Sequence, residues 1–189
     1  MTSFDLRIRV VPAIRDIPSA AWDACANPPE PTLAAEGPPL AADAQAPCPA
    51  APSAHSTESY NPFISHAFLH ALEASSSATA RAGWQPQHLV AEGADGTVVG
   101  VVPCYLKSHS RGEYVFDRGW AEAYEHAGGS YYPKLQVSVP FTPATGRRLL
   151  ARPGPGADDV RAGLAAGLVE LCRLRDASSV HVTFAPVEE

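Results

Sequence analysis

The sequence predicts an α/β protein with a mixed sheet, and three observations carry this prediction. Residues 4–12 alternate apolar and polar side chains, the pattern of a half-buried strand. Strand patterns at 88–92 and 97–106 flank Asp95-Gly96, a pair typical of a tight hairpin turn. Apolar residues at helical spacing mark an amphipathic helix over residues 158–175. Because strand and helix patterns alternate along the chain, we expect one layered fold.

The other elements are predicted from capping and turn residues. Asp16 or Ser19 can cap a short helix, and Ser65 can cap a second one that ends in a serine run. Pro103 interrupts the second hairpin strand and predicts an edge position or a bulge. We expect strand pairing to continue through Tyr114–Phe116. The remaining patterns predict a helix at 119–127 that Gly128-Gly129 closes, and strands at 135–139 and 180–184.

The composition changes abruptly between Asn27 and Ser59. This segment holds eight prolines, many alanines and almost no large apolar side chain. Such a sequence cannot bury enough apolar surface to offset the entropy lost on ordering. We therefore predict a single domain made of residues 1–26 and 60–189, with residues 27–59 as a disordered insertion rich in proline and alanine.

Length and charge narrow the classes of function. The chain has 189 residues, 46% of them hydrophobic, and a formal net charge of −6. An acidic protein is unsuited to broad binding of a phosphate backbone, so no DNA partner is expected. The N-terminus lacks a secretory pattern, and no apolar run approaches the ~18 residues that a membrane span requires. A cytoplasmic protein without a membrane span is the prediction.

Cysteine and histidine spacing gives no metal motif. Cys25, Cys48, Cys104 and Cys172 form no C-x-x-C pair and match no zinc pattern. We expect buried thiols in a reducing compartment, and no metal.

One stretch, from Tyr105 to Arg148, stands out as a candidate site. It holds eight of the fifteen Phe, Trp and Tyr residues of the chain in under a quarter of its length. Ionisable residues are interleaved with these aromatic ones. A ligand site needs apolar walls with a few placed polar groups, and this composition provides both.

Several phrases of the sequence resemble the FemAB-like family, whose members are labelled GNAT-type N-acyltransferases or peptidoglycan biosynthesis/recognition proteins. The resemblance runs from about Ile8 to Phe184 and skips only the proline-rich segment. The phrases are Asn61-Pro62-Phe63, Phe68-Leu69 with Ala71-Leu72-Glu73, Gly83-Trp84-Gln85-Pro86-Gln87-His88-Leu89, Pro103-Cys104-Tyr105-Leu106-Lys107, Gly112-Glu113-Tyr114-Val115-Phe116-Asp117, Tyr131-Tyr132-Pro133-Lys134-Leu135 and Pro140-Phe141-Thr142-Pro143.

The resemblance implies a GNAT-like domain, with a mixed, mostly antiparallel sheet flanked by helices. Family members resemble tandem pairs of such halves, about twice this length. The chain would then correspond to the N-terminal half, and a second GNAT-like half is the expected partner. The implied activity is transfer of an acyl or aminoacyl group to a small-molecule or peptide amine. The donor would be acetyl-CoA, another acyl-CoA or a charged tRNA, and the acidic charge counts against the tRNA.

A phosphate of coenzyme A would need backbone N–H donors at a helix N-terminus. Arg152, Gly154 and Gly156 lie directly before the helix predicted at 158–175, where GNAT folds similarly use a glycine-bearing loop. The match is imperfect for two reasons. Arg152 is one residue closer to Gly154 than in the GNAT loop, and the intervening prolines lack N–H groups. The alternative is an ordinary loop that begins a helix.

Proton transfer from the attacking amine would need a base, and Glu113 and His109 are the candidates, with Tyr114 as an acid. A carboxylate among aromatic rings can have a raised pKa, which suits a base. The alternative is that Glu113 pairs with Lys107, Arg111 or Arg118 at a strand edge. Asp117 is predicted to cap the following helix.

Substrate binding is assigned to Lys107, Tyr131, Tyr132 and Lys134, which could present ring walls and cations to an anionic group. Alternatively, the tyrosines wedge the Gly128-Gly129 turn against the sheet.

At the level of the whole chain two hypotheses stay open. One is an N-acyltransferase, and the other is a non-catalytic ligand-binding or scaffold half-domain that needs a second half.

Overall fold

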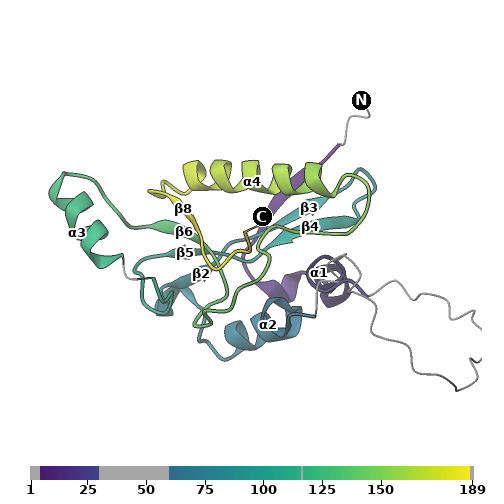
Figure 1. The fold of residues 1–189 in the computed structure, drawn as a ribbon, viewed down its shortest axis with the longest axis horizontal. Coiled ribbons are helices and arrows are strands. Elements are labelled where there is room, and N and C mark those ends of the chain that lie inside the picture. Colours follow the sequence, from purple (N-terminus) through teal and green to yellow (C-terminus); the bar gives the residue numbers. More distant parts are fainter. Residues whose placement is uncertain (1–4, 30–59, 116, 188–189) are drawn as a thin grey trace, which may run out of the picture.

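A computed structural model of the chain describes residues 5–29, 60–115 and 117–187 (Figure 1). In these residues it has four α-helices: α1 (Ser19–Ala26), α2 (His66–Ala74), α3 (Arg118–His126) and α4 (Ala157–Leu174). Single 3₁₀ turns lie at Ile14–Asp16, Pro62–Ile64 and Ala80–Ala82. The strands are β1 (Arg7–Val11), β2 (Trp84–Pro86), β3 (His88–Glu92), β4 (Val98–Val102), β5 (Cys104–Lys107), β6 (Lys134–Val137), β7 (Leu150–Ala151) and β8 (Val180–Val182).

The strands form two four-stranded sheets that share one long hairpin. The first sheet has the order β1-β3-β4-β7 and the second the order β2-β5-β6-β8. Every neighbouring pair is antiparallel except β6 and β8, which are parallel. Gln87 separates β2 from β3, Pro103 separates β4 from β5, and the Gln87 N–H donates to the Cys104 carbonyl at 2.8 Å. The interruption predicted at Pro103 is therefore the point where the hairpin passes from one sheet to the other.

The predicted α/β class is confirmed, and most predicted elements are present within one or two residues. The strand predicted at Tyr114–Phe116 is wrong. Residues 111–113 turn, Tyr114 has a left-handed φ of 57°, and neither Tyr114 nor Val115 pairs with a strand. Phe116 lies outside the described residues. So do residues 30–59, which hold most of the predicted disordered insertion, and Cys48 with them.

Helices cover both sides of the sheets (Figure 1). The apolar stripe of α4, made by Val160, Leu164, Leu168 and Leu171, is buried on one side. Gly100 lets this helix approach β4, because a Cβ there would lie 2.6 Å from Val160 Cγ1. On the other side, α1 and α2 contribute Trp22 and Leu69 to a second apolar cluster.

The helix caps agree with the sequence prediction for α2 only. Ser65 caps α2 as predicted, whereas neither Asp16 nor Ser19 caps α1, because Pro18 holds the N-cap position of that helix.

The two faces of the second sheet differ in character. Side chains alternate between faces along each strand, and strand pairing aligns them across the sheet. One face carries Cys104, Leu106, Leu135 and Val137, and it belongs to the core under α4. The opposite face, here called the polar face, carries Trp84, Tyr105, Lys107, Lys134 and Gln136. These five side chains are buried. A buried face with this many polar groups is the unusual feature of the fold.

Candidate functional site

Four ionisable side chains meet at one end of the polar face. Lys107 and Lys134 lie opposite each other on β5 and β6, and the segment after β5 brings Glu113 and Asp117 onto them. Lys134 Nζ donates to Glu113 Oε2 at 2.8 Å and to Asp117 Oδ2 at 2.6 Å, and Lys107 Nζ lies 3.7 Å from Glu113 Oε1. The two lysine and Glu113 side chains are 0% exposed. Two cations and two carboxylates thus form a charge cluster whose formal charges cancel.

Aromatic side chains and a serine complete this charge cluster. Asp117 Oδ2 accepts hydrogen bonds from Tyr131 Oη at 2.9 Å and from Ser110 Oγ at 2.8 Å. Tyr132 Oη lies 2.7 Å from the same Ser110 hydroxyl. Asp117 stands at the N-cap position of α3, but its side chain caps no helix N–H, so the capping role predicted for it is wrong. A buried ammonium is the stronger partner for its carboxylate.

The aromatic rings also contact the cations directly. Lys107 Nζ lies 3.4 Å from the centre of the Trp84 ring, a cation–π contact that stabilises a desolvated ammonium. Tyr131 and Tyr132 pack edge to face at 5.0 Å, and Lys134 Nζ is 5.4 Å from the Tyr131 ring. The Gly129 turn is covered by Tyr124, whose ring lies where a Gly129 Cβ would be. The ring that lies against this turn is therefore that of Tyr124.

Burial shifts the pKa values of the cluster in opposite directions. It lowers the pKa of Lys107 to about 7, with Glu113 opposing the shift. Burial raises the pKa of Glu113, and the hydrogen bond and charge of Lys134 oppose that shift. Burial would also raise the pKa of Asp117, but hydrogen bonds from Lys134, Ser110 and Tyr131 outweigh it and hold this pKa below its usual value. Of the two carboxyl groups, Asp117 is thus the one that ionises more readily, and Glu113 the one that binds a proton more readily.

The Lys107 shift predicts a pH dependence of stability. Between pH 7 and 10.5 the unfolded chain keeps the Lys107 proton that the folded chain has lost, so the free energy of unfolding rises with pH through this window. From pH 7 to pH 9 we expect a gain on the order of 1–2 kcal/mol that the Lys107→Met variant lacks. Urea denaturation of both proteins at each pH measures the difference. Equal pH dependence in the two proteins would show that Lys107 stays charged in the fold.

His109 and Tyr114, the other predicted catalytic residues, lie near the cluster but are not part of it. The His109 ring packs over Gly83, and its Nδ1 accepts the Arg111 N–H at 3.2 Å. Burial and the charges of Lys107 and Arg111 lower the His109 pKa, so the ring is neutral near pH 7. The Tyr114 side chain is 56% exposed, and no hydrogen bond joins it to another described residue.

The predicted phosphate turn lies at the other end of the domain (Figure 1). Arg152 and Gly154 are exposed, Gly156 is the N-cap of α4 with a φ of 87°, and the Arg152 N–H donates to the Val99 carbonyl at 2.8 Å. The C-terminal end of α4 leads instead to the charge cluster, because the Ser178 N–H donates to Pro133 next to Lys134. The 18 residues of α4 span roughly 27 Å at 1.5 Å per residue. The structure therefore does not bring the turn and Glu113 together.

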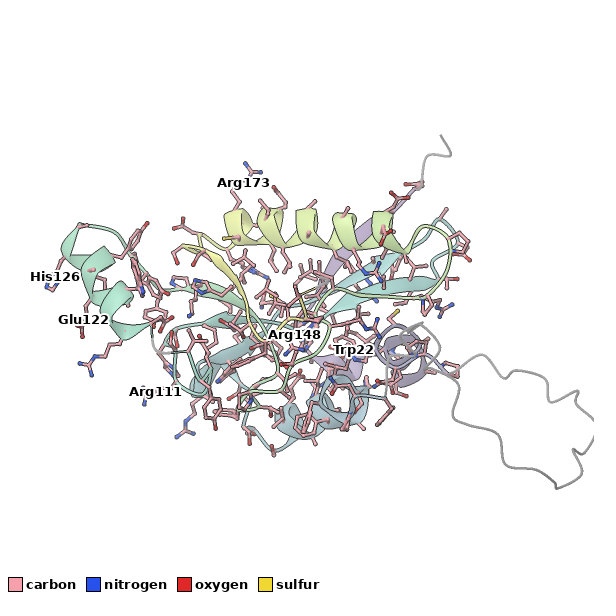
Figure 2. All side chains as sticks on the ribbon, in the orientation of Figure 1. Trp22, Arg111, Glu122, His126, Arg148 and Arg173 are labelled. Atoms are coloured by element: carbon pink, nitrogen blue, oxygen red, sulfur yellow. The ribbon has the colours of Figure 1, made fainter. Side chains whose placement is uncertain are left out.

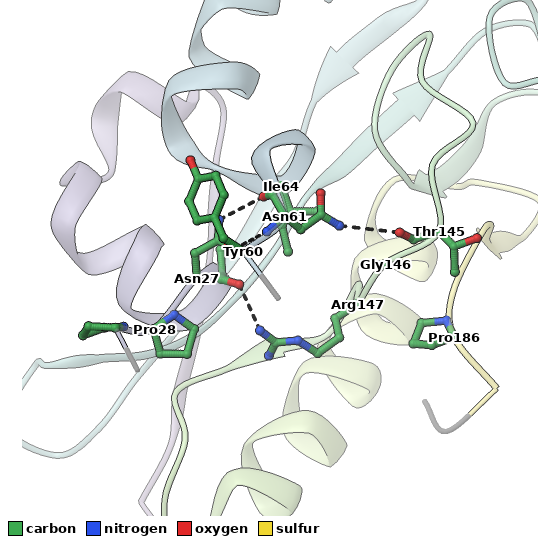
Figure 3. Close-up of a pocket in the computed structure, with 11 residues that line it drawn as sticks. Asn27, Pro28, Tyr60, Asn61, Ile64, Thr145, Gly146, Arg147 and Pro186 are labelled. Atoms are coloured by element: carbon green, nitrogen blue, oxygen red, sulfur yellow. Dashed lines mark hydrogen bonds between the residues drawn. The ribbon is translucent and has the colours of Figure 1, made fainter. Parts of the chain in front are cut away.

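A pocket of about 520 Å³ lies at a third place, where α1 ends (Figure 3). Asn27 and Asn61 close one side with reciprocal hydrogen bonds, Asn27 Nδ2 to the Asn61 carbonyl at 3.0 Å and the Asn61 N–H to Asn27 Oδ1 at 2.9 Å. Arg147 lies opposite and donates to the Ala26 carbonyl at 2.9 Å. Pro186 and Ile64 add apolar walls. Sequence reasoning missed this pocket, and the adjacent Arg147 and Arg148 were its only signal.

Arg148 shapes the wall of this pocket from inside the fold (Figure 2). Its side chain is 0% exposed. The guanidinium donates to the carbonyls of Ala144, Gly146, Arg147 and Thr183 at 2.7–3.1 Å. Thr183 directly follows β8, and its N–H donates to Val137 of β6. Arg148 therefore ties the 144–147 turn to the point where β6 and β8 separate.

No group of three His, Cys, Asp or Glu side chains within residues 5–29, 60–115 and 117–187 could hold a metal ion. In the same residues, no helix is both long enough and apolar enough to cross a bilayer.

The fold defines a mixed α/β domain, with mostly antiparallel sheets flanked by helices. A model of the FemAB-like family, described as peptidoglycan biosynthesis/recognition, matches residues 13–189, and the chain belongs to this family. Among solved structures, an acetyltransferase from Trypanosoma brucei is similar at 15% identity with a TM-score of 0.39, over 94% of this chain and 82% of that one. No curated protein matches the sequence significantly.

Proposed function

We propose that the chain is a GNAT-type N-acyltransferase that moves an acyl or aminoacyl group onto an amine. The observation that carries the proposal is the buried Glu113 carboxyl group. Its Oε2 is held by Lys134, its Oε1 has no hydrogen-bond partner among the described residues, and its pKa is raised by burial. A positioned carboxyl group with a raised pKa, and with an oxygen that accepts no hydrogen bond from these residues, suits a general base. Membership of the FemAB-like family supports the reaction class.

The reaction proceeds by direct attack within a ternary complex. The amine nitrogen attacks the carbonyl carbon of the donor thioester, the N–C bond forms and the C–S bond breaks. The thiolate of coenzyme A leaves, and the proton of the amine passes to Glu113. Lys134 keeps the carboxylate in place, while Tyr131, Tyr132 and Lys107 form the ring walls and the second cation beside it.

The donor is an acyl-CoA, acetyl-CoA in the simplest case, with a charged tRNA as the alternative that the net charge of −6 disfavours. The turn with Arg152, Gly154 and Gly156 is the proposed phosphate site, because it lies directly before α4 and a helix N-terminus suits an anion. Both proposed donors occur in the cytoplasm, the location that the sequence predicts.

Replacing Glu113 with Gln is expected to lower acetyl transfer by about 10²–10⁴-fold, because the amine then loses its base. The rate of thiol release from acetyl-CoA in the presence of an amine mixture measures this. Glu122→Gln, on the exposed face of α3, is the control and should leave the rate unchanged. A melt with acetyl-CoA shows whether each variant is folded and binds the donor. Full activity of Glu113→Gln would remove Glu113 from the mechanism.

A second candidate function is a scaffold or ligand-binding half-domain that docks a second GNAT-like half. The observation that favours it is the outer edge of β8. Among the described residues no strand pairs with this edge, and Val182 on it is 46% exposed. Open edges readily accept a further strand. A chain that melts cooperatively, but whose midpoint acetyl-CoA does not raise, would favour this function over the transferase.

A further inference from the structure

The pocket at the end of α1 has no part in the proposed transfer reaction. Its volume of about 520 Å³ is within the range of small-molecule sites, roughly 300–1,000 Å³. None of the four charge-cluster residues is among the described residues that line it. In Figure 1, α1, which ends at the pocket, and α3, which follows the charge cluster, are well separated along the long axis of the domain. A ligand in this pocket would therefore have a site of its own.

The polar wall of the pocket is held in place before any ligand binds. Asn27 and Asn61 fix each other by their reciprocal hydrogen bonds, and Asn61 Nδ2 also approaches a carbonyl of the 144–147 turn at 3.5 Å. Gly146 lets this turn come so close, because a Cβ there would clash with Asn61 Nδ2. From inside the fold, the Arg148 guanidinium binds three carbonyls of the same turn. A site formed in advance loses little conformational entropy when a ligand binds.

The lining of the pocket is electropositive. Arg147 contributes a guanidinium group, and no Asp or Glu is among the described residues that line the pocket. A second guanidinium group lies near the same end of α1. Burial raises the pKa of the Cys25 thiol in α1 to about 11, and the charges of Arg152 and Arg147 both oppose this shift. Because the whole chain carries a formal charge of −6, this local positive charge sets the pocket apart and favours an anion.

The two asparagine side chains add neutral donors beside this charge. A side-chain amide nitrogen can donate two hydrogen bonds. Among the described residues, Asn27 Nδ2 and Asn61 Nδ2 donate one each. A guanidinium group next to amide N–H groups suits the oxygen atoms of a carboxylate or a phosphate, since hydrogen bonds to a charged acceptor are the stronger ones.

The other walls of the pocket are apolar (Figure 3). Ile64, Pro28 and Pro186 line it, together with Tyr60, which is 67% exposed. These side chains offer contact area to the carbon atoms of a ligand. We propose that the pocket binds an organic anion, whose carboxylate or phosphate group faces Arg147 and the two asparagines and whose apolar body contacts Tyr60 and Pro186. This site is additional to the transferase site and does not depend on the proposed reaction.

Titrations with small probes test the charge and the body of the ligand separately. Benzoate and phenyl phosphate carry both groups, benzamide is the uncharged counterpart of benzoate, and inorganic phosphate has no apolar body. In NMR spectra at constant ionic strength, one or both organic anions should shift the amide signals of Asn61 and Gly146 with a millimolar dissociation constant. Benzamide and inorganic phosphate should bind about tenfold more weakly, because each lacks one of the two groups that the pocket contacts.

The same titrations decide against the proposal as clearly as for it. Benzamide binding as tightly as benzoate, or no saturable shift with either organic anion, would overturn it. If the site is confirmed, the organic anion that binds more tightly shows whether the pocket prefers a carboxylate or a phosphate.

Substitutions at two positions assign the binding to named side chains. Arg147→Gln should weaken binding of the organic anion about tenfold, and Arg147→Lys, which keeps the charge, should recover part of the affinity. Tyr60→Ala should weaken the organic anion but leave inorganic phosphate unchanged. The control, Arg173→Gln on the exposed side of α4, should bind as the native chain does. Because Arg147 also donates to the Ala26 carbonyl, a melt without ligand shows whether each variant is folded. Unchanged affinity in Tyr60→Ala, or in folded Arg147→Gln, would refute the site.

Discussion

Replacing Arg148 with Met is expected to lower the free energy of unfolding by about 3–5 kcal/mol, a large part of the stability of a typical domain. The guanidinium is fully buried and donates to four carbonyls, three of them in the 144–147 turn. Without it these carbonyls lose a charged donor inside the fold, where each unmet group costs stability. Urea denaturation measures the loss.

Arg148→Lys separates the shape of the group from its charge. A single ammonium cannot reach four carbonyls in the planar arrangement of a guanidinium, so this variant should recover little of the stability. Hydrogen exchange should show faster exchange at the Gly146 and Thr183 amides, which bond to Phe184 and Val137. The control is Arg173→Gln, which changes an exposed side chain of α4 and should leave the free energy of unfolding unchanged. A stable Arg148→Met protein would mean that the turn is held by other contacts.

Replacing Lys134 with Met should also lower the free energy of unfolding by about 3–5 kcal/mol, because two buried carboxylates then lose the ammonium that pairs with both of them. The measurement is again urea denaturation, at pH 7. The loss should shrink as the pH is lowered, because burial raises the pKa of Glu113 and a protonated carboxyl group no longer needs a cation.

Two further variants show whether a loss of stability in Lys134→Met comes from unpaired buried charge. Adding Glu113→Gln to Lys134→Met should restore part of the stability, since one of the unpaired charges is removed. Arg118→Gln breaks an exposed pair with Glu122 at 2.8 Å and should change little, because water screens that pair. If Lys134→Met were as mild as Arg118→Gln, the charge cluster would not stabilise the fold.

Local patterns in the sequence predict most of the fold. The hairpin around Asp95-Gly96 and the helix after Gly156 depend on neighbouring residues, and both are present as predicted. The strand at Tyr114–Phe116 was wrong because aromatic, β-favouring side chains follow Gly112, where the chain turns with a φ of 81°. That turn is set by the contact of Gly112 with Phe141, which no local pattern contains.

In the candidate site, too, local sequence predicted some features, and contacts between distant residues determined the others. The residue types of the charge cluster could be selected from composition, and a Lys107–Glu113 pair was one of the alternatives. The burial of the charge cluster could not be predicted, because it depends on strand pairing that places Lys134 of β6 opposite Lys107 of β5. Asp117 shows why local sequence was insufficient. Its position before a helix predicted a capping role, but its carboxylate binds Lys134, which lies 17 residues later in the chain. The pocket joins residues around 27, 61, 146 and 186, so no single segment reveals it.

The reciprocal hydrogen bonds between Asn27 and Asn61 have a consequence for how the sequence can change. They hold together two residues that are 34 apart in the sequence, at the end of α1. The cost of closing a loop grows only slowly with its length once its ends are held together. A change in the number of residues between these asparagines should therefore alter the free energy of unfolding only slightly. The position is a natural insertion point, suited to shortening the chain for crystallisation or to grafting in a tag.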